Sequence, residues 1–293
     1  MHQLQPSTPL QRGSEVAIVA SSSALSDDVR LKAGQALLES WGLNCLPANV
    51  VERRWGYLAG RDENRLGDLA SSAPLLACAR GGWGAARLLE HTIHWQPGWL
   101  LGFSDVTALL WSRLAAGYGG NIHGPLLTTL ASEPLWSQER LRQLLFGEPL
   151  ADLKGEGLGG GMVCGPLIAA NLTVASHLLG SGHVPDLNGA ILILEDVGEA
   201  PYRIDRMLTH WRLCGLLQQL AGIGFGSFEG CCDEEPATDQ TFTLEQVLKE
   251  RTADLNIPRV INLPVGHRPG NAALPLGRTA RLDGDQGSLS LQL

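Results

Sequence analysis

The sequence of 293 residues lacks the signals of several large protein classes. No apolar run reaches the roughly 18 residues of a transmembrane helix, so we predict no membrane-spanning segment and no membrane partner. No run of Lys and Arg occurs, and the formal charge of −8 is not the electrostatic footprint of a nucleic-acid-binding protein. The first six residues have neither a basic nor an apolar region, so we expect no secretory signal.

The sequence also lacks the common metal and cofactor motifs. The six cysteines are scattered and form no C-x-x-C pair, which favours reduced thiols in a cytoplasmic protein over a disulfide framework. H-E-x-x-H is missing, and the glycines that follow a predicted strand at 81–84 match neither G-x-G-x-x-G nor the P-loop. We therefore predict no metal and no cofactor.

What remains is the composition of a folded α/β protein. Hydrophobic residues make up 44% and charged residues 18%, which excludes intrinsic disorder. The length predicts one large domain or two modest ones. In the first half, apolar runs typical of buried strands alternate with helical spacing, which predicts a parallel sheet with crossover helices. The predicted strands are 15–20, 43–51, 75–79 and 99–102, and the predicted helices are 27–41, 85–91 and 106–116.

The composition changes after the first half. A Gly-rich stretch predicts a linker at 151–162, between an N-terminal domain over 1–150 and a C-terminal domain over 163–293. In the second half we predict strands at 190–194, 220–228 and 259–265, helices at 202–217 and 243–251, and a β-rich tail at 280–293.

Ser104 stands between a predicted strand and a predicted helix, in Gly102-Phe103-Ser104-Asp105. A serine on such a sharp turn exposes its hydroxyl, and the following backbone N–H groups can stabilise an oxyanion. The match to G-x-S-x-G is imperfect because Val106 takes the last Gly position. A helix-capping serine is the alternative interpretation.

A second glycine-rich turn, Arg80-Gly81-Gly82-Trp83-Gly84, also follows a strand. Successive glycines let the backbone approach a ligand and point N–H groups at an anion. The alternative is an ordinary tight turn.

An acid and a histidine complete the candidate set. Glu195 and Glu199 lie at and just beyond the end of the strongest strand of the second half, where acids of α/β sheets commonly line a crevice. His267 follows a strand among turn residues, which suits a general base, and His123 is the rival. Spacing alone leaves both pairs of alternatives open.

Taken together, the segments resemble the LD-carboxypeptidases, the murein tetrapeptide carboxypeptidase group that also contains the microcin-immunity peptidases. Five stretches in family order carry the resemblance: 79–89, 102–109, 171–181 (Asn-Leu-Thr and Leu-Leu-Gly-Ser), 194–208, and Gly266-His267 with 274–277. The implied fold class is α/β, with an N-terminal parallel-sheet, Rossmann-like (amidotransferase-like) domain and a smaller β-rich α/β C-terminal domain.

The resemblance implies a serine peptidase whose triad falls on Ser104, Glu195 and His267. The implied oxyanion hole consists of the backbone N–H groups of Gly82 and Asp105. The candidate substrate-binding residues are Arg80, Trp83, Asn171 and Arg203. The two arginines are candidates for binding the substrate carboxylate. Arg203 could equally be a helix-surface residue. The sequence departs from the family at Ser21, Trp83 and Ala169-Ala170, where the family usually has Pro, Tyr and Gly-Gly.

The implied activity is removal of the terminal D-alanine from a murein tetrapeptide or related muropeptide, in peptidoglycan recycling in the cytoplasm. The implied assembly is a homodimer. The first rival is a microcin-immunity type hydrolase of peptidyl-aminoacyl nucleotides, which needs an aromatic platform that we do not identify in the sequence. The second rival is a non-catalytic peptide-binding module on the same fold, against which the intact triad argues.

Overall fold

A computed structural model describes residues 4–233 and 241–291, which form two compact units. The first unit comprises Met1–Ala151, Gly180–Pro185 and Pro269–Gly277, and the second comprises Asp152–Leu179, Asp186–Arg268 and Arg278–Leu293, in both cases within the described residues. Two short segments of the C-terminal half therefore belong to the N-terminal unit, which sequence composition did not indicate.

The first unit is built on a six-stranded sheet within the described residues. Its strands, in spatial order, are β12 (Leu274–Leu276), β5 (Asn121–His123), β4 (Trp99–Gly102), β3 (Leu75–Cys78), β1 (Glu15–Val19) and β2 (Asn44–Cys45). The strands from β5 to β2 are parallel, and β12 joins β5 antiparallel. The parallel sheet with crossover helices is thus confirmed, while the strand expected over 43–51 shrinks to two residues.

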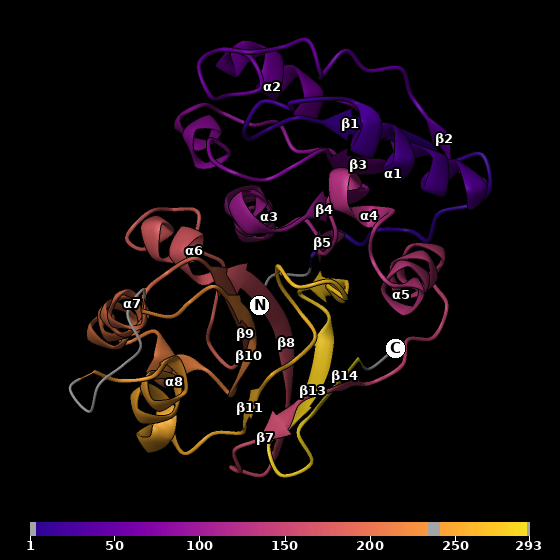
Figure 1. The fold of residues 1–293 in the computed structure, drawn as a ribbon. Helices are drawn as coiled ribbons and strands as arrows, with labels where there is room; N and C mark the ends of the chain where they lie inside the picture. The colour runs from indigo at the N-terminus through magenta and orange to yellow at the C-terminus, as the bar shows by residue number, and fades with distance from the viewer. Residues whose placement is uncertain (1–3, 234–240, 292–293) are drawn as a thin grey trace. The chain divides into compact units, whose positions relative to one another are not determined.

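Helices cover both faces of this sheet. They are α1 (Val29–Ser40), α2 (Asp62–Leu69), α3 (Thr107–Ala115), α4 (Leu127–Leu130) and α5 (Leu135–Phe146), with short 3-10 turns η1 (Ala86–Glu90) and η2 (Ser104–Val106). Figure 1 shows α2 and α3 on one side of the strands and α1, α4 and α5 on the other. Because both faces are covered, the strands are buried apolar runs, such as Leu75–Cys78 and Trp99–Gly102.

The second unit contains an eight-stranded sheet among the residues described. In spatial order its strands are β6 (Leu153–Lys154), β14 (Ser288–Leu291), β13 (Thr279–Asp283), β8 (Met162–Asn171), β9 (Ile191–Val197), β10 (Gly222–Glu229), β11 (Arg259–Ile261) and β7 (Glu156–Gly157). The four strands from β8 to β11 are parallel, and the flanking strands are antiparallel. The β-rich α/β character expected of this half is confirmed.

The segment 151–162, expected to be a linker, instead lies in this sheet. It contains β6 and β7 and the first residue of β8. Its glycines serve close packing: a Cβ on Gly155 would lie 2.3 Å from the carbonyl oxygen of Ile261, and one on Gly157 would lie 2.2 Å from that of Gly284. Glycine enrichment at this point therefore reflects close backbone approach between strands.

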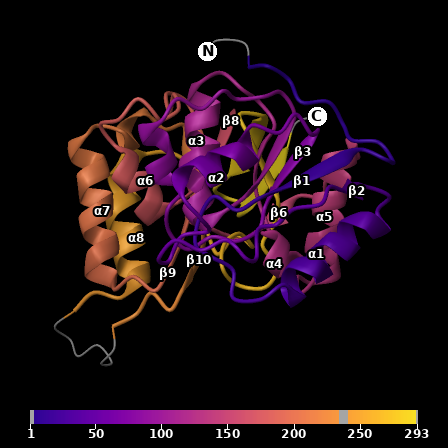
Figure 2. The same cartoon turned by 90° about the horizontal axis from the view of Figure 1, so that it is seen from above.

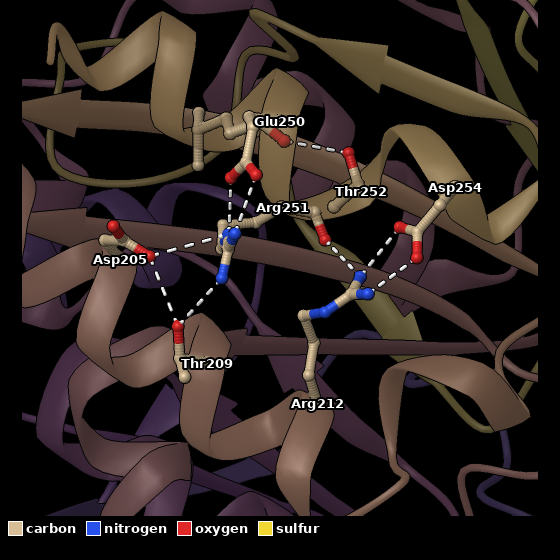
Figure 3. A network of polar contacts seen from close by, with 8 residues as sticks. Asp205, Thr209, Arg212, Glu250, Arg251, Thr252 and Asp254 are labelled. Carbon is tan, nitrogen blue, oxygen red and sulfur yellow. Dashed lines mark hydrogen bonds and ion pairs between the residues drawn. The ribbon is translucent and has the colours of Figure 1, made fainter.

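The helices of the second unit are α6 (Leu172–Leu178), α7 (Pro201–Leu213) and α8 (Leu244–Thr252), with 3-10 turns η3 (Leu217–Gln219) and η4 (Ala253–Leu255). Both views show α7 and α8 side by side (Figures 1 and 2). Two arginines link α7 to α8 and to η4 (Figure 3). Arg212 of α7 donates to the carbonyl oxygen of Arg251 in α8 at 2.9 Å and forms a bidentate pair with Asp254 of η4 at 2.6 and 2.8 Å. Arg251 donates back to Thr209 of α7 at 3.2 Å. The helix that we predicted over 202–217 ends at Leu213.

Candidate active site

The nucleophile candidate Ser104 lies in the first unit, directly after β4. Its φ is +62°, a left-handed conformation that a serine adopts rarely and at a cost of about 1–3 kcal/mol. The turn is tight, because a Cβ on Gly102 would lie 2.7 Å from Cγ1 of Val106. The chain thus turns sharply from β4 into η2 at Ser104, as the sequence predicted, and the N-cap position of η2 is occupied by Phe103.

The glycine turn lies against this serine. A Cβ on Gly81 would be 3.2 Å from both Cβ and Oγ of Ser104. Gly82 has φ +107°, and a Cβ there would lie 2.3 Å from Oγ of Ser23. Only glycine can therefore bring the backbone of this turn beside the Ser104 side chain.

Asp105, the residue after Ser104, is 1% exposed. Its Oδ2 accepts a hydrogen bond from the backbone N–H of Ala85 at 2.8 Å. Burial raises the pKa of Asp105 above its ordinary value, against the lowering effect of the Ser22 hydroxyl and of the backbone amides of Ala85 and Gly84. Besides the backbone N–H that the sequence offered as an oxyanion donor, Asp105 therefore has a carboxylate that links the turn at Ser104 to the residue after the glycine turn.

Arg80 and Trp83 flank the two glycines. The Arg80 guanidinium donates from Nη1 to the carbonyl oxygen of Ala24 at 2.9 Å. The Trp83 backbone N–H donates to Oγ of Ser23 at 3.0 Å, and its side chain is 46% exposed. Both side chains therefore stand at a turn that contacts Ser104.

The acid and base candidates lie in the second unit and contact each other. Glu195 is near the end of β9 and fully buried, and its Oε2 lies 2.7 Å from Nδ1 of His267. A buried carboxylate on Nδ1 favours the tautomer with the proton on that atom, which leaves Nε2 as the proton acceptor. The structure thus pairs Glu195 with His267, the combination that the resemblance implied.

Burial alone would lower the pKa of His267, but the hydrogen bond and charge of Glu195, with the charge of Asp196, outweigh it and raise that pKa. Burial raises the pKa of Glu195, opposed by the hydrogen bond and charge of His267. Each group therefore stabilises the charged form of the other.

Local geometry explains why this pair forms. β11 ends at Ile261 because Asn262 adopts φ +59°, so the strand expected over 259–265 stops early and the chain turns. Gly266 has φ +123°, and a Cβ there would lie 2.9 Å from Oε2 of Glu195. The loop can thus carry His267 onto the carboxylate only with glycine at position 266.

Asp196, the neighbour of Glu195, has a different set of partners. It accepts hydrogen bonds from Nδ2 of Asn171 at 3.0 Å and from the backbone N–H and Oγ1 of Thr173, both at 2.8 Å. Oδ1 of Asn171 in turn caps α6 through Val174 at 3.0 Å. Asn171 therefore ties α6 to the end of β9.

The other candidates lie apart from the pair. Arg203 is on the exposed side of α7, where its Nη1 is 3.3 Å from Oε2 of Glu199 and its guanidinium stacks near Tyr202. His123 is fully buried at the end of β5, where its ring and that of Phe103 form a T-shaped pair with centroids 5.7 Å apart. His123 is thus in the same unit as Ser104, whereas His267 is in the unit of Glu195.

The described residues, 4–233 and 241–291, contain no group of three or more His, Cys, Asp or Glu side chains that could hold a metal ion. None of the helices in that part of the chain is long and apolar enough to cross a membrane. A strained serine after a strand, glycine backbone beside it, and a buried glutamate–histidine pair are the components of a serine hydrolase.

Comparison with known proteins identifies the family. Residues 16–124 match the model of the LD-carboxypeptidase N-terminal domain, and residues 164–282 match that of the LD-carboxypeptidase C-terminal domain. A protein of Synechocystis sp. is 48% identical over 98% of this chain and 97% of its own length. The chain belongs to the LD-carboxypeptidases, a family of serine peptidases.

A murein tetrapeptide carboxypeptidase of Pseudomonas aeruginosa is 37% identical, with 92% of this chain and 94% of that protein covered. The fold is shared with a muramoyltetrapeptide carboxypeptidase of Oxalobacter formigenes (TM-score 0.81, 24% identity, 95% and 98% of the two chains covered). It is also shared with the wild-type microcin C7 self immunity protein MccF (TM-score 0.84, 19% identity, 98% of each chain covered). The relatives support a peptidase role for this chain.

Proposed function

We propose that this protein is a serine carboxypeptidase that hydrolyses the L,D bond of a murein tetrapeptide and releases the terminal D-alanine. The observation that carries the proposal is the 2.7 Å contact between buried Glu195 and His267. A glutamate buried in this way is costly unless it serves a partner. The relative named as a murein tetrapeptide carboxypeptidase supports the substrate class.

In the proposed reaction, Nε2 of His267 removes the hydroxyl proton of Ser104 as Oγ attacks the carbonyl carbon of the scissile bond. Glu195 orients the imidazole and stabilises its charged form. His267 then gives the proton to the departing amine of D-alanine. Water, activated by the same histidine, attacks the acyl-enzyme and restores Ser104.

The tetrahedral intermediate carries an oxyanion, for which we propose the backbone N–H groups of Gly82 and Asp105. Support comes from the closeness of the glycine turn to Ser104: a Cβ on Gly81 would lie 3.2 Å from the Ser104 side chain. Loss of one such donor typically costs about 3–4 kcal/mol of transition-state stabilisation.

A carboxypeptidase must also bind the free carboxylate of its substrate, and a cation suits this task. Of the two candidate arginines we favour Arg80, which adjoins the glycine turn beside Ser104. Arg203 has its guanidinium engaged with Glu199 and Tyr202 on the surface of α7, as expected of a helix-surface residue. Trp83, exposed next to the same turn, is our candidate for contact with the rest of the substrate. We assign Asn171 to holding Asp196 in place.

Peptidoglycan recycling in the cytoplasm and a homodimeric assembly remain predictions from the family. They are consistent with a muropeptide substrate and add no residue to the proposed site.

The test is mass-spectrometric detection of free D-alanine from purified murein tetrapeptide, with the parent beside Ser104→Ala and His267→Gln. We expect release by the parent and a loss on the order of 10⁶-fold in kcat for Ser104→Ala. Ser26→Ala, an exposed serine of the same unit, is the matched control and keeps the parent rate.

A peptidyl adenylate is the second substrate in the same assay. Cleavage of the adenylate without D-alanine release would assign the chain to the immunity-type hydrolases. Tight tetrapeptide binding without turnover, unchanged by Ser104→Ala, would indicate a binding module instead.

A further inference from the structure

Arg65, in the middle of α2, is a charged side chain with no exposed surface. Arginine is almost never buried completely unless it is paired, because the charge must be taken out of water. The proposed reaction does not use Arg65, so its burial calls for a separate explanation.

The guanidinium of Arg65 bridges two backbone segments. Nη1 donates to the carbonyl oxygen of Ser21 at 2.6 Å and to that of Gly84 at 2.8 Å. Nη2 forms an ion pair with Asp62, one turn earlier in α2, at 2.6 Å. Arg65 therefore connects the segment after β1 to the last residue of the glycine turn, with Asp62 fixing the position of its head group.

Other contacts hold the neighbouring residues of the same turn. Oγ of Ser23 accepts from the Trp83 backbone N–H at 3.0 Å, and Oδ2 of Asp105 accepts from that of Ala85 at 2.8 Å. The three consecutive residues Trp83, Gly84 and Ala85 are thus each held by a different side chain, from Ser23, Arg65 and Asp105 respectively. Immediately before them, Gly81 lies against Ser104 and Gly82 carries a proposed oxyanion donor.

We propose that Arg65 is a positioning residue for catalysis: it fixes the glycine turn so that its N–H groups meet the oxyanion formed at Ser104. This inference rests on the proposed function of Ser104 and Gly82. The physical reason is that preorganised donors act only at the correct distance, and a displacement of about 1 Å can cost on the order of 100-fold in rate. A planar guanidinium that donates to two carbonyls and one carboxylate resists such a displacement better than lysine does.

Arg113, in α3 of the same unit, provides a matched control. It is 2% exposed and also donates to backbone carbonyls, at 2.6 Å to Gly119 and at 3.0 Å to Gly98. Gly98 and Gly119 precede β4 and β5, so Arg113 serves the end of the parallel strands opposite to Ser104. Both arginines are buried and both brace backbone, but only Arg65 contacts the glycine turn.

The experiment compares Arg65→Lys and Arg113→Lys on murein tetrapeptide. We expect kcat to fall about 10- to 100-fold in Arg65→Lys with KM changed less than about threefold. Arg113→Lys lowers the melting temperature but keeps kcat within about twofold of the parent. Equal kcat in the two variants overturns the proposal, because burial and charge are matched. Should Arg65→Lys not fold, Asp62→Asn loosens the same guanidinium and is expected to lower kcat less, in the same direction.

Hydrogen–deuterium exchange supplies a readout that needs no substrate. In Arg65→Lys we expect faster exchange in the peptide spanning 80–86 than in the parent or in Arg113→Lys. The Gly84 carbonyl loses its guanidinium link to Ser21, so the turn moves more and the hydrogen bonds of the flanking Trp83 and Ala85 amides open more often. Unchanged exchange in this peptide overturns the positioning role, whether or not the parent is active. Absence of D-alanine release by the parent is a separate result, which rejects the proposed function. Faster exchange with unchanged kcat shows that the turn is held but that catalysis does not depend on it, which also overturns the proposal.

Discussion

At the scale of single residues, the Glu195–His267 pair makes a prediction about pH. His267 must be neutral to accept the proton of Ser104, so activity falls as the pH drops through the pKa of His267. Burial acts to lower that pKa, but Glu195 raises it above the ordinary value of about 6.5. In Glu195→Gln the carboxylate charge is gone while burial remains. The acid limb of the rate profile should therefore move to lower pH, and the maximal rate should fall by about 10⁴-fold, as in comparable triads.

The measurement is kcat/KM for D-alanine release between about pH 5 and pH 9 in parent and variant. Glu199→Gln is the control, because Glu199 contacts Arg203 and not His267. An acid limb that stays in place, or moves to higher pH, would contradict the role assigned to Glu195.

Single residues also show how far the sequence could lead. The turn around Ser104 was predictable because strand, small residues and helix follow one another along the chain. Glu195 and His267 are separated by 72 positions, so their contact depends on the fold and came only through family resemblance. Arg65 was missed altogether, because a charged residue in a largely polar helix gives no signal of burial.

At the scale of elements, the packing of α1 against α4 depends on one glycine. A Cβ on Gly34 would lie 2.1 Å from the carbonyl oxygen of Leu127. A side chain at this position would therefore force the backbones of α1 and α4 apart. We expect Gly34→Ala to lower the free energy of unfolding by about 2–3 kcal/mol, as measured in urea titrations.

Gly67 in α2 is the matched control for Gly34. It is also inside a helix of the first unit, but nothing lies within 4 Å of the position of its Cβ. Without a steric penalty, alanine has the better helix propensity, so Gly67→Ala should raise the free energy of unfolding by up to about 1 kcal/mol. A higher free energy of unfolding in both variants would show that helix propensity, and not the contact between α1 and α4, determines the effect of substituting Gly34.

The helices and strands that could not be predicted from the sequence share physical features that explain the failure. α2 has only Arg65 and Leu69 buried, too few apolar positions for a periodic pattern. β6 and β7 are two residues each and are held by partners far along the chain, β14 and β11. Long apolar runs such as 75–78 and 191–194 were predictable, because buried parallel strands require them.

At the scale of the whole molecule, the residues of the proposed reaction are divided between the two units. Ser104 and the glycine turn belong to the first, and Glu195 with His267 belongs to the second. The chain enters the first unit again at 269–277, two residues after His267, and then returns to the second unit, where it forms β13 and β14. The histidine thus lies close in sequence to a point where the chain passes from one unit to the other.

The distribution of the proposed triad over two units predicts how the Ser104→Ala variant responds to substrate. This variant should bind the substrate without cleaving it. With murein tetrapeptide at about 100 times its dissociation constant, binding should stabilise the folded protein by about 2.7 kcal/mol. Because the proposed triad takes Ser104 from the first unit and His267 from the second, hydrogen–deuterium exchange should slow in 80–86 and also in 262–268. Ser104→Ala with His267→Gln, which weakens the second half of the site, should keep the first effect and reduce the second. Protection confined to one unit in the single variant would show that the substrate is bound by that unit alone, and the proposed triad would have to be abandoned.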